Sequence, residues 1–483
     1  MKVETIDLAP DLTIARVLNG LWQIADMERD GQKLDLDETA KAMVPYVEAG
    51  FTTFDMADHY GSAEIISGKF KKKYSLLDPV QFITKWVPTP GAVSKEDVRK
   101  AVLLSLNRLQ SQRIDLMQFH AWNYADPRWL DCLYWLQELK EEGLIHHLGL
   151  TNFDTAHLRI VCNSGIKVVS NQVSFSPLDQ RAAKGMTALC IQNNVKLLVF
   201  GTVAGGFLTE KWLNQPEPAS DKIATWSQMK YKRFIDATGG WKIFQQFLQA
   251  IDSIAKQNHV PISNIVSRYM LEQPAVAGII MGTRLGVSQH IEENLKLFGF
   301  SLPMESRVKI QSALSLLEPI PGDCGDEYRM PPFLTASGDL THHVESFPAP
   351  YPMKVGMDGR TKALSGTVWE DLAGFSRALR KGNRILISGT TATHGSNTIG
   401  GQDPAAQAHF VIDKIEGALQ SLGGSLGEVV RTRIFIRNIS DWEAIARVHG
   451  ERFRDIQPAN TMVRADLIGD EYLVEMEAEA VVG

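Results

Sequence analysis

The sequence has 483 residues, of which 44% are hydrophobic and 22% are charged, and its formal net charge is −6. This composition is typical of a globular protein and excludes disordered, collagen-like and small disulfide-rich classes. The negative net charge provides no general attraction to nucleic acid or to anionic lipid. We therefore expect neither as a partner.

Four widely separated cysteines indicate a reducing compartment, because they include no C-x-x-C pair and suit neither a disulfide framework nor a zinc site. The N-terminal residues lack the apolar run of a secretory signal, and no stretch approaches the ~18 apolar residues of a membrane span. The pairs His146–His147 and His342–His343 lack a third ligand at a useful spacing. We expect a cytoplasmic protein without a metal site.

Proline usage divides the chain into two parts. Seven of the 21 prolines lie between Pro319 and Pro352, interleaved with glycines. Proline has no backbone donor and disrupts helix interiors, so this composition predicts an extended linker over 319–365. The linker would separate a first domain over 1–318 from a second domain over 366–483.

The first domain opens with an alternating pattern around a proline-containing turn, which predicts a hairpin at the N-terminal end of a barrel. Short β-branched runs then alternate with amphipathic segments, as in strand–helix units of a parallel sheet. Eight such units predict an α/β protein with a (β/α)8 or TIM barrel. The alternative is an open doubly wound sheet, but no G-x-G-x-x-G or P-loop pattern supplies its phosphate turn. The expected strands are 17–22, 51–56, 81–86, 114–120, 145–151, 167–174, 195–200 and 277–283, and the expected helices include 95–110 and 241–258.

Polar side chains end the second, third and fourth expected strands. Catalysis in such barrels takes place at the C-terminal strand ends and in the loops that follow them. Asp55 ends the second strand and Tyr60 lies in its loop, whereas Lys85 and His120 end the next two. A lysine there is most often solvated, and a histidine is as often packed in the core. All four at one barrel mouth nevertheless favour a catalytic set.

These side chains could deliver a proton during the reduction of a carbonyl group. Tyrosine titrates near pH 10, so we expect Lys85, held by Asp55, to lower the pKa of Tyr60. The phenol would protonate the forming alkoxide, and His120 would donate a second hydrogen bond to the same oxygen. Because no protein group donates hydride, the reductant has to be a cofactor.

The motifs around these residues resemble those of the aldo-keto reductase family. FDMADHYGSAE, ITKW, DLMQFH, GLTNF, NQVSFSPLD, GTVAGGFLTEKW and IIMGTR…SQHIEENL follow the order of that family's signatures over roughly residues 3–300. The resemblance implies NADP(H)-dependent reduction of an aldehyde or ketone. It implies Asp55, Tyr60, Lys85 and His120 as the catalytic residues, with Tyr60 as the general acid.

The same resemblance implies cofactor-binding positions. Asn152 and Gln172 fall where the family holds the nicotinamide carboxamide, and Phe200 falls where many members stack a tyrosine on the nicotinamide ring. The residues that would hold the adenosine end are Arg284, His290, Glu293 and Asn294. A guanidinium suits a 2′-phosphate, which favours NADPH over NADH. The segment AWNYADP departs from the family's HxP or HRPD pattern and identifies no substrate, and the tryptophans of 212–241 could cover the mouth or equally pack on the surface.

The second domain has a different pattern. Strands separated by blocks of helix predict an α+β fold with an antiparallel-biased sheet. The expected strands are 374–379, 384–388, 429–437, 460–467 and 472–482, and the expected helices are 404–422 and 441–454. From WEDLAGFSRALRKGNRILISGTTA to the C-terminus the sequence resembles the RidA/YjgF (Rid) family, which implies a chorismate-mutase-like fold and a homotrimer with clefts between subunits.

One substitution separates this domain from the best-known Rid members, which hydrolyse enamine and imine products. Asn460 stands where they use an arginine to bind the substrate carboxylate, and an amide cannot make that bidentate charged contact. Deaminase activity is therefore not expected. Ser376 and Arg377 could line the cleft on an early strand. Glu475 or Glu477 could position a water, although their alternation more simply predicts outward-facing strand residues.

We therefore expect a reductase fused to a Rid-like domain that oligomerises the chain or binds small imine-type molecules. The alternative is a non-catalytic NADP(H) sensor that uses the Rid-like domain for assembly. A nucleic-acid role for the second domain is not expected, because the alternation in RTRIFIR is typical of a solvated strand face.

Overall fold

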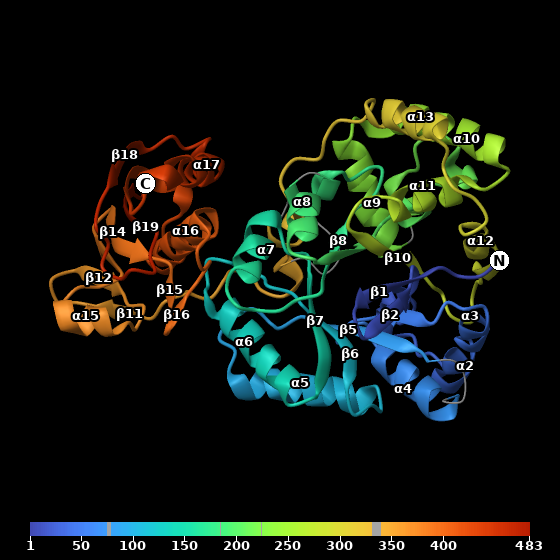
Figure 1. Ribbon diagram of the computed structural model, residues 1–483, viewed down its shortest axis with the longest axis horizontal. Coiled ribbons are helices and arrows are strands. Elements are labelled where there is room, and N and C mark those ends of the chain that lie inside the picture. Colours follow the sequence, from blue (N-terminus) through green and yellow to red (C-terminus); the bar gives the residue numbers. More distant parts are fainter. Residues whose placement is uncertain (75–78, 184, 224, 331–339) are drawn as a thin grey trace.

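The computed structural model describes all residues except 75–78, 184, 224 and 331–339. A closed barrel of eight parallel strands is followed by a smaller unit built on a seven-stranded sheet (Figure 1). Both the TIM barrel and the smaller α+β unit confirm the predicted fold class. No helix in the described part of the chain combines the length and apolar character needed to cross a membrane. The four cysteines are free thiols.

A hairpin covers one end of the barrel, as predicted. β1 (Thr5–Ala9) pairs antiparallel with β2 (Leu12–Ala15). Leu8, Leu12 and Ile14 are buried in one apolar cluster with residues of the barrel strands. Removing these side chains from water fastens the hairpin to the barrel.

The eight barrel strands lie within three residues of their predicted bounds. They read as nearly continuous buried runs, because strands of a parallel barrel are covered on both faces. The strands are β3 (Val17–Gly20), β4 (Thr53–Asp55), β5 (Gln81–Trp86), β6 (Ile114–Phe119), β7 (Ile145–Thr151), β8 (Ser170–Ser174), β9 (Lys196–Phe200) and β10 (Val276–Gly282). Parallel pairing of β10 with β3 closes the barrel.

Helices surround the barrel, and local capping fixes several of their ends. Asp35 caps α2 through its side chain, and Ser94 and Asp97 form a reciprocal capping box at the start of α5. The helices of this unit are α1 (Trp22–Met27), α2 (Leu36–Lys41), α3 (Val44–Glu48), α4 (Ala63–Lys73), α5 (Lys95–Arg108), α6 (Arg128–Glu141), α7 (Thr155–Cys162), α8 (Gly185–Gln192), α9 (Trp226–Ala237), α10 (Gly240–Asn258), α11 (Ile262–Leu271), α12 (Ile291–Lys296) and α13 (Met304–Leu314).

The segment predicted as an extended linker, 319–365, is partly folded, and the extended interpretation is wrong for it. Its end forms a hairpin of β11 (Met353–Val355) and β12 (Arg360–Ala363), which pairs onward into the second sheet. The prolines stop at Pro352, and the left-handed backbone of Gly359, with φ 74°, suits the hairpin turn. Residues 331–339 of this prediction lie outside the described part.

The second sheet has the strand order β11-β12-β13-β14-β19-β17-β18 and is antiparallel except for β17 and β18. Its further strands are β13 (Ala378–Lys381), β14 (Arg384–Thr391), β17 (Val429–Ile436), β18 (Ala459–Arg464) and β19 (Val474–Val481), and β15 (Thr393–His394) and β16 (Asn397–Thr398) form a separate ribbon. The helices are α15 (Val368–Ala373), α16 (Pro404–Ser421) and α17 (Trp442–Phe453). The strand predicted at 374–379 starts later, because α15 ends in a left-handed Gly374.

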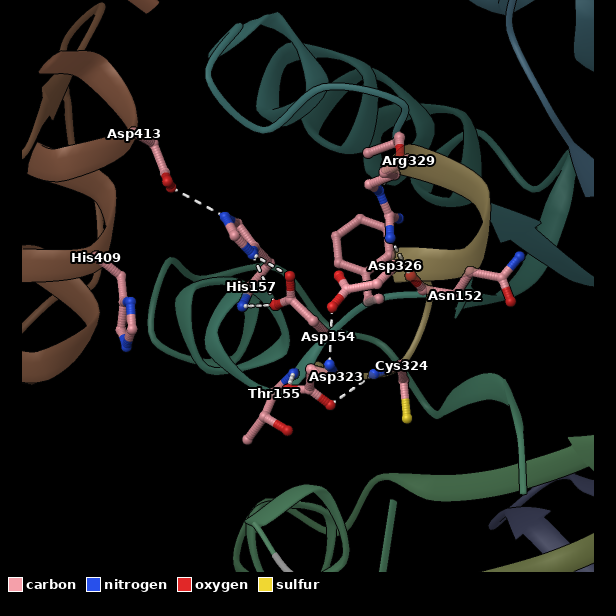
Figure 2. Close-up of polar contacts among 12 residues, drawn as sticks. Asn152, Asp154, Thr155, His157, Asp323, Cys324, Asp326, Arg329, His409 and Asp413 are labelled. Carbon is pink, nitrogen blue, oxygen red and sulfur yellow. Dashed lines mark hydrogen bonds and ion pairs between the residues drawn. The ribbon is translucent and has the colours of Figure 1, made fainter. Parts of the chain in front are cut away.

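The two units meet where α16 lies against α7 (Figure 1). Within the described part of the chain, three contacts between a basic side chain and a carboxylate bridge this boundary: His157 Nε2 to Asp413 Oδ2 at 2.9 Å, Arg159 Nη1 to Asp403 Oδ2 at 2.8 Å, and His394 Nε2 to Asp131 Oδ1 at 2.8 Å. His157 is the most buried of the three basic side chains, and its other nitrogen, Nδ1, lies 2.6 Å from Asp154 (Figure 2). The boundary is therefore polar as well as packed.

Candidate active site

A buried ion pair occupies the centre of the barrel mouth. Lys85 on β5 and Asp55 at the end of β4 are each 3% exposed. Lys85 Nζ donates to both carboxylate oxygens of Asp55, at 2.7 and 2.9 Å, and to the carbonyl oxygen of Met56 at 2.6 Å. These three bonds use all the ammonium donors. Burial lowers the pKa of Lys85, and the carboxylate of Asp55 opposes that effect.

Tyr60 lies beside this pair, with the Lys85 ammonium 5.1 Å from the centre of its ring. Desolvation, followed by the negative charge of Asp55, raises the pKa of Tyr60 well above its ordinary value. The predicted net lowering of this pKa is therefore not found, because burial and the charge of Asp55 dominate it. The Lys85 ammonium uses its three N–H groups in hydrogen bonds to Asp55 and Met56, and the carboxylate of Asp55 balances its charge. The phenol instead stays protonated at neutral pH, which is the form that a proton donor requires.

His120 follows β6 and lies at the same mouth, 2% exposed. Burial lowers the pKa of His120 well below its ordinary value, and Arg329 adds to this effect, so the ring is neutral. Its Nδ1 lies 3.4 Å from the carbonyl oxygen of Thr151, and its Nε2 has no hydrogen-bond partner within the described residues. A neutral ring carries one N–H, so donation from Nε2 requires the tautomer that gives up the long contact to Thr151.

Three expected nicotinamide-binding residues lie around this mouth. Asn152 follows β7 with a left-handed φ of 58°, and its side-chain Oδ1 is buried without a partner among the described residues. Gln172 on β8 donates from Nε2 to Asp55 Oδ1 at 2.7 Å. Phe200 ends β9, and the Lys230 ammonium lies 4.7 Å from the centre of its ring. An unpaired carbonyl oxygen and an aromatic ring at one mouth fit a ligand that carries an amide donor on a flat ring.

The expected adenosine-binding residues follow β10. Arg284 has a buried Nε without a hydrogen-bond partner in the described part, so its guanidinium has donor capacity for an anion. Exposed His290 precedes α12, and its Nδ1 lies 3.0 Å from Glu293 Oε2. Asn294 is buried on the same helix. The structure brings the four residues onto one loop and one helix.

A short helix, α14 (Asp326–Arg329), covers the mouth, which the sequence patterns did not indicate. Arg329 donates to the carbonyl oxygens of Ala121 and Asn152, each at 2.7 Å. Tyr328 lies 6.1 Å from the His120 ring and accepts a hydrogen bond from Lys230 Nζ at 2.7 Å. The segment thus ties the residues that follow β6 and β7 together, and Figure 2 shows Arg329 bonded to Asn152.

Aromatic rings complete the walls. Trp22 packs edge-on against Tyr60 at 4.9 Å, and Trp226 from the expected covering loop packs against Trp22 at 5.5 Å. Trp212 and Trp241 instead pack against Phe207. Only one of the three tryptophans of that loop therefore reaches the mouth.

The space beside His120 is small. A cavity of about 50 Å³ there is lined by residues that include Pro88, Trp122, Trp129 and Phe347. Such a volume holds about one or two waters. The wall from Phe347 belongs to the chain between the two units, so this connection shapes the mouth as well as joining the domains.

In the second unit, two of the candidate residues, Arg377 and Glu475, both lie against Gly389. Asn460 on β18 donates from its side chain to Thr432 Oγ1 at 2.9 Å. Arg377 immediately precedes β13 rather than lying on it, is 5% exposed, and donates to the carbonyl oxygen of Gly389 at 2.6 Å. Glu475 is partly buried, and burial followed by the charge of Glu477 raises its pKa.

The statement that the histidine pair on β7 lacks a third ligand is also wrong. Asp11 of the β1–β2 turn lies within hydrogen-bond distance of both His146 and His147. Asp11 could not be recognised as a ligand from the sequence, because it is far from the two histidines along the chain and only the folded hairpin brings it to the start of β7.

Residues 16–315 match the model of the family described as "Aldo/keto reductase family", and residues 368–482 match that described as "Endoribonuclease L-PSP". Methylglyoxal reductase DkgA of Yersinia pestis is 26% identical over 297 residues, which cover 60% of this chain and 86% of that protein. The glycerol dehydrogenase structure from Gluconobacter oxydans is 20% identical, with a TM-score of 0.54, covering 67% of this chain and 98% of its own. A YjgF/YER057c/UK114 family structure from Mycobacterium tuberculosis is 40% identical, with a TM-score of 0.24, covering 26% of this chain and 99% of its own.

The first of these matches spans more than half of the chain and coincides with the closed barrel that carries Asp55, Tyr60, Lys85 and His120. The second coincides with the seven-stranded sheet and its helices. The chain belongs to the aldo/keto reductase family of oxidoreductases and carries a C-terminal RidA/YjgF-like domain.

Proposed function

We propose that the chain reduces an aldehyde or ketone with NADP(H), and that Tyr60 is the general acid. The observation that carries the proposal is the buried Lys85–Asp55 pair beside a protonated phenol, with the unpartnered His120 Nε2 at the same mouth. The phenol supplies the proton, and the Nε2–H tautomer of His120 would orient the carbonyl oxygen. The buried pair fixes the position of Lys85 beside the phenol.

The residues present fit a nicotinamide dinucleotide. Among the described residues, Asn152 Oδ1 and Arg284 Nε have no hydrogen-bond partner; the first suits a carboxamide N–H and the second a phosphate. Phe200 offers a ring face. His290, Glu293 and Asn294 would hold the adenosine end beside Arg284. When bound, NADPH would supply the hydride that no side chain provides.

A cofactor-consumption assay tests this function. We expect NADPH absorbance to fall in the presence of a panel of aldehydes and ketones, and to fall more slowly with NADH, because Arg284 has donors to spare for a 2′-phosphate. Methylglyoxal belongs in the panel because of the similarity to methylglyoxal reductase. NADPH binding without consumption by any carbonyl would favour the alternative, a non-catalytic sensor.

We further propose that the Rid-like domain assembles the chain as a homotrimer, without deaminase activity. One face of its sheet is buried under helices, whereas the opposite face bears exposed Leu386 and the ion-paired Arg433 and Glu477. A sheet face left open within one chain suits a subunit interface.

Free cysteines suit a reducing compartment, and we propose the cytoplasm, which cell fractionation would test.

Sedimentation measures the assembly directly. We expect the mass of three chains at micromolar concentration, and dissociation on Leu386→Glu, which places an unpaired charge on the open face. The matched variant Val287→Glu adds the same charge at an exposed position of the barrel and should leave the mass unchanged. A monomeric wild type would contradict the proposed trimer.

A further inference from the structure

Two histidines and one carboxylate converge at the base of the barrel, at the opposite end of β7 from Thr151 and the mouth. His146 Nε2 lies 2.8 Å from Asp11 Oδ2, and His147 Nε2 lies 2.7 Å from Asp11 Oδ1. One ligand atom from each of the three residues lies within 4.8 Å of the others. The two imidazole nitrogens therefore point at one carboxylate rather than at separate partners.

This donor set is that of a transition-metal site. Zn²⁺ binds imidazole nitrogen and carboxylate oxygen at about 2.0–2.2 Å, which sets neighbouring ligand atoms of a tetrahedral site about 3.3 Å apart. The present separations of nitrogen and oxygen need to lengthen by only about half an ångström to reach that value. The Asp11 side chain is 62% exposed, so water can complete the coordination.

A metal ion binds imidazole nitrogen without its proton and binds the ionised carboxylate. The ion would therefore replace the hydrogen bonds that now join the two Nε2 atoms to Asp11, and its uptake would release protons.

We propose that Asp11, His146 and His147 bind one divalent transition-metal ion of the Zn²⁺ class at the base of the barrel. The ion would join the turn of the β1–β2 hairpin to the start of β7. Because Thr151 and the catalytic candidates lie at the other end of this strand, the ion would fasten the hairpin rather than take part in the reduction.

Calorimetric titration of the tag-free full chain with Zn²⁺, after treatment with a chelator, tests the site. We expect one ion per chain. The double variant His146→Gln/His147→Gln keeps side-chain amide donors toward Asp11 but removes both nitrogen ligands, and it should bind Zn²⁺ at least about 100-fold more weakly. The matched control His259→Asn removes an exposed histidine from a left-handed turn and should bind normally.

Asp11→Asn provides a second variant at an exposed position, where the fold is least affected, and it should also weaken binding. Saturating Zn²⁺ should raise the midpoint of thermal unfolding of the wild type but not that of Asp11→Asn. Failure of the wild type to take up one equivalent of Zn²⁺, or equal affinities of the wild type and Asp11→Asn, would overturn the proposal.

Discussion

Replacing Tyr60 with phenylalanine should lower kcat for carbonyl reduction by about 10²- to 10⁴-fold while NADPH binding is retained. The substitution removes only the hydroxyl, so the ring still packs against Trp22 and the Lys85–Asp55 pair remains closed. The measurement pairs steady-state NADPH consumption with a binding titration that follows tryptophan fluorescence, because Trp22 and Trp226 lie at the mouth.

The pH dependence of the wild type adds a second readout. Because desolvation and Asp55 raise the pKa of Tyr60, the phenol should not lose its proton near neutral pH, and no fall in rate around pH 8 should arise from it. Tyr134→Phe is the matched control, because the Tyr134 hydroxyl donates to Ser164 on the outside of the barrel. A Tyr60→Phe enzyme with unchanged kcat would contradict the assignment of the general acid.

The second large effect is expected at the contact between the two units. His157→Gln should lower the midpoint of thermal unfolding at pH 6, because it removes the cation between Asp154 and Asp413. Burial alone would lower the pKa of His157, but these two carboxylates outweigh it and raise the pKa to about 9. A rise from 6.5 to about 9 corresponds to about 3 kcal/mol of stability.

The sign of the pH dependence follows from these shifts. The contribution of His157 is fully present below pH 6.5 and is lost as the pH rises through about 9. Burial would raise the pKa of Asp154, but His157 outweighs this and lowers it to about 2, so the contribution of that carboxylate is lost only as the pH falls through about 2. The midpoint of thermal unfolding of the wild type should therefore fall as the pH is raised from 6 to 9.5. The midpoint of His157→Gln should depend much less on pH over this range.

His394→Asn is the control at the same boundary. His394 faces one carboxylate, Asp131, and is more exposed than His157, so its loss should cost less. Amide hydrogen exchange in α7 and α16, corrected for the intrinsic effect of pH on exchange, shows whether the loss of stability lies at this boundary. Equal pH profiles for the wild type and His157→Gln would show that this ring does not stabilise the contact.

Strand positions in the barrel could be predicted from sequence because local patterns determine them. A parallel strand covered on both faces is a short, mostly buried run, and QFITKW and IHHLGLT each coincide with a strand of this kind. The same logic placed Asp55, Lys85 and His120 at strand ends and hence at one mouth. Their mutual effects were harder to predict, because the pKa of Tyr60 depends on how deeply the ring is buried and how close it lies to Asp55.

Contacts between segments far apart in the chain could not be predicted. Asp413 lies 256 positions from His157, and Asp11 lies 135 from His146, so no local pattern connects them. The helix α14 could not be predicted, because its four residues are too few to show a helical period. The prolines and glycines around α14 indicated a linker, whereas in the structure Tyr328 and Arg329 contact residues of the barrel.

The helix α14 lies between two folded bodies, and this position limits how the mouth can open. A cover at the end of a chain can swing aside, but this one is anchored by the barrel behind it and by the strand pair β11–β12 ahead of it. In the proposed reaction, a carbonyl compound would reach Tyr60 past a segment that is joined to a folded unit on either side. Cutting the chain between α14 and β11 would leave α14 attached to the barrel alone.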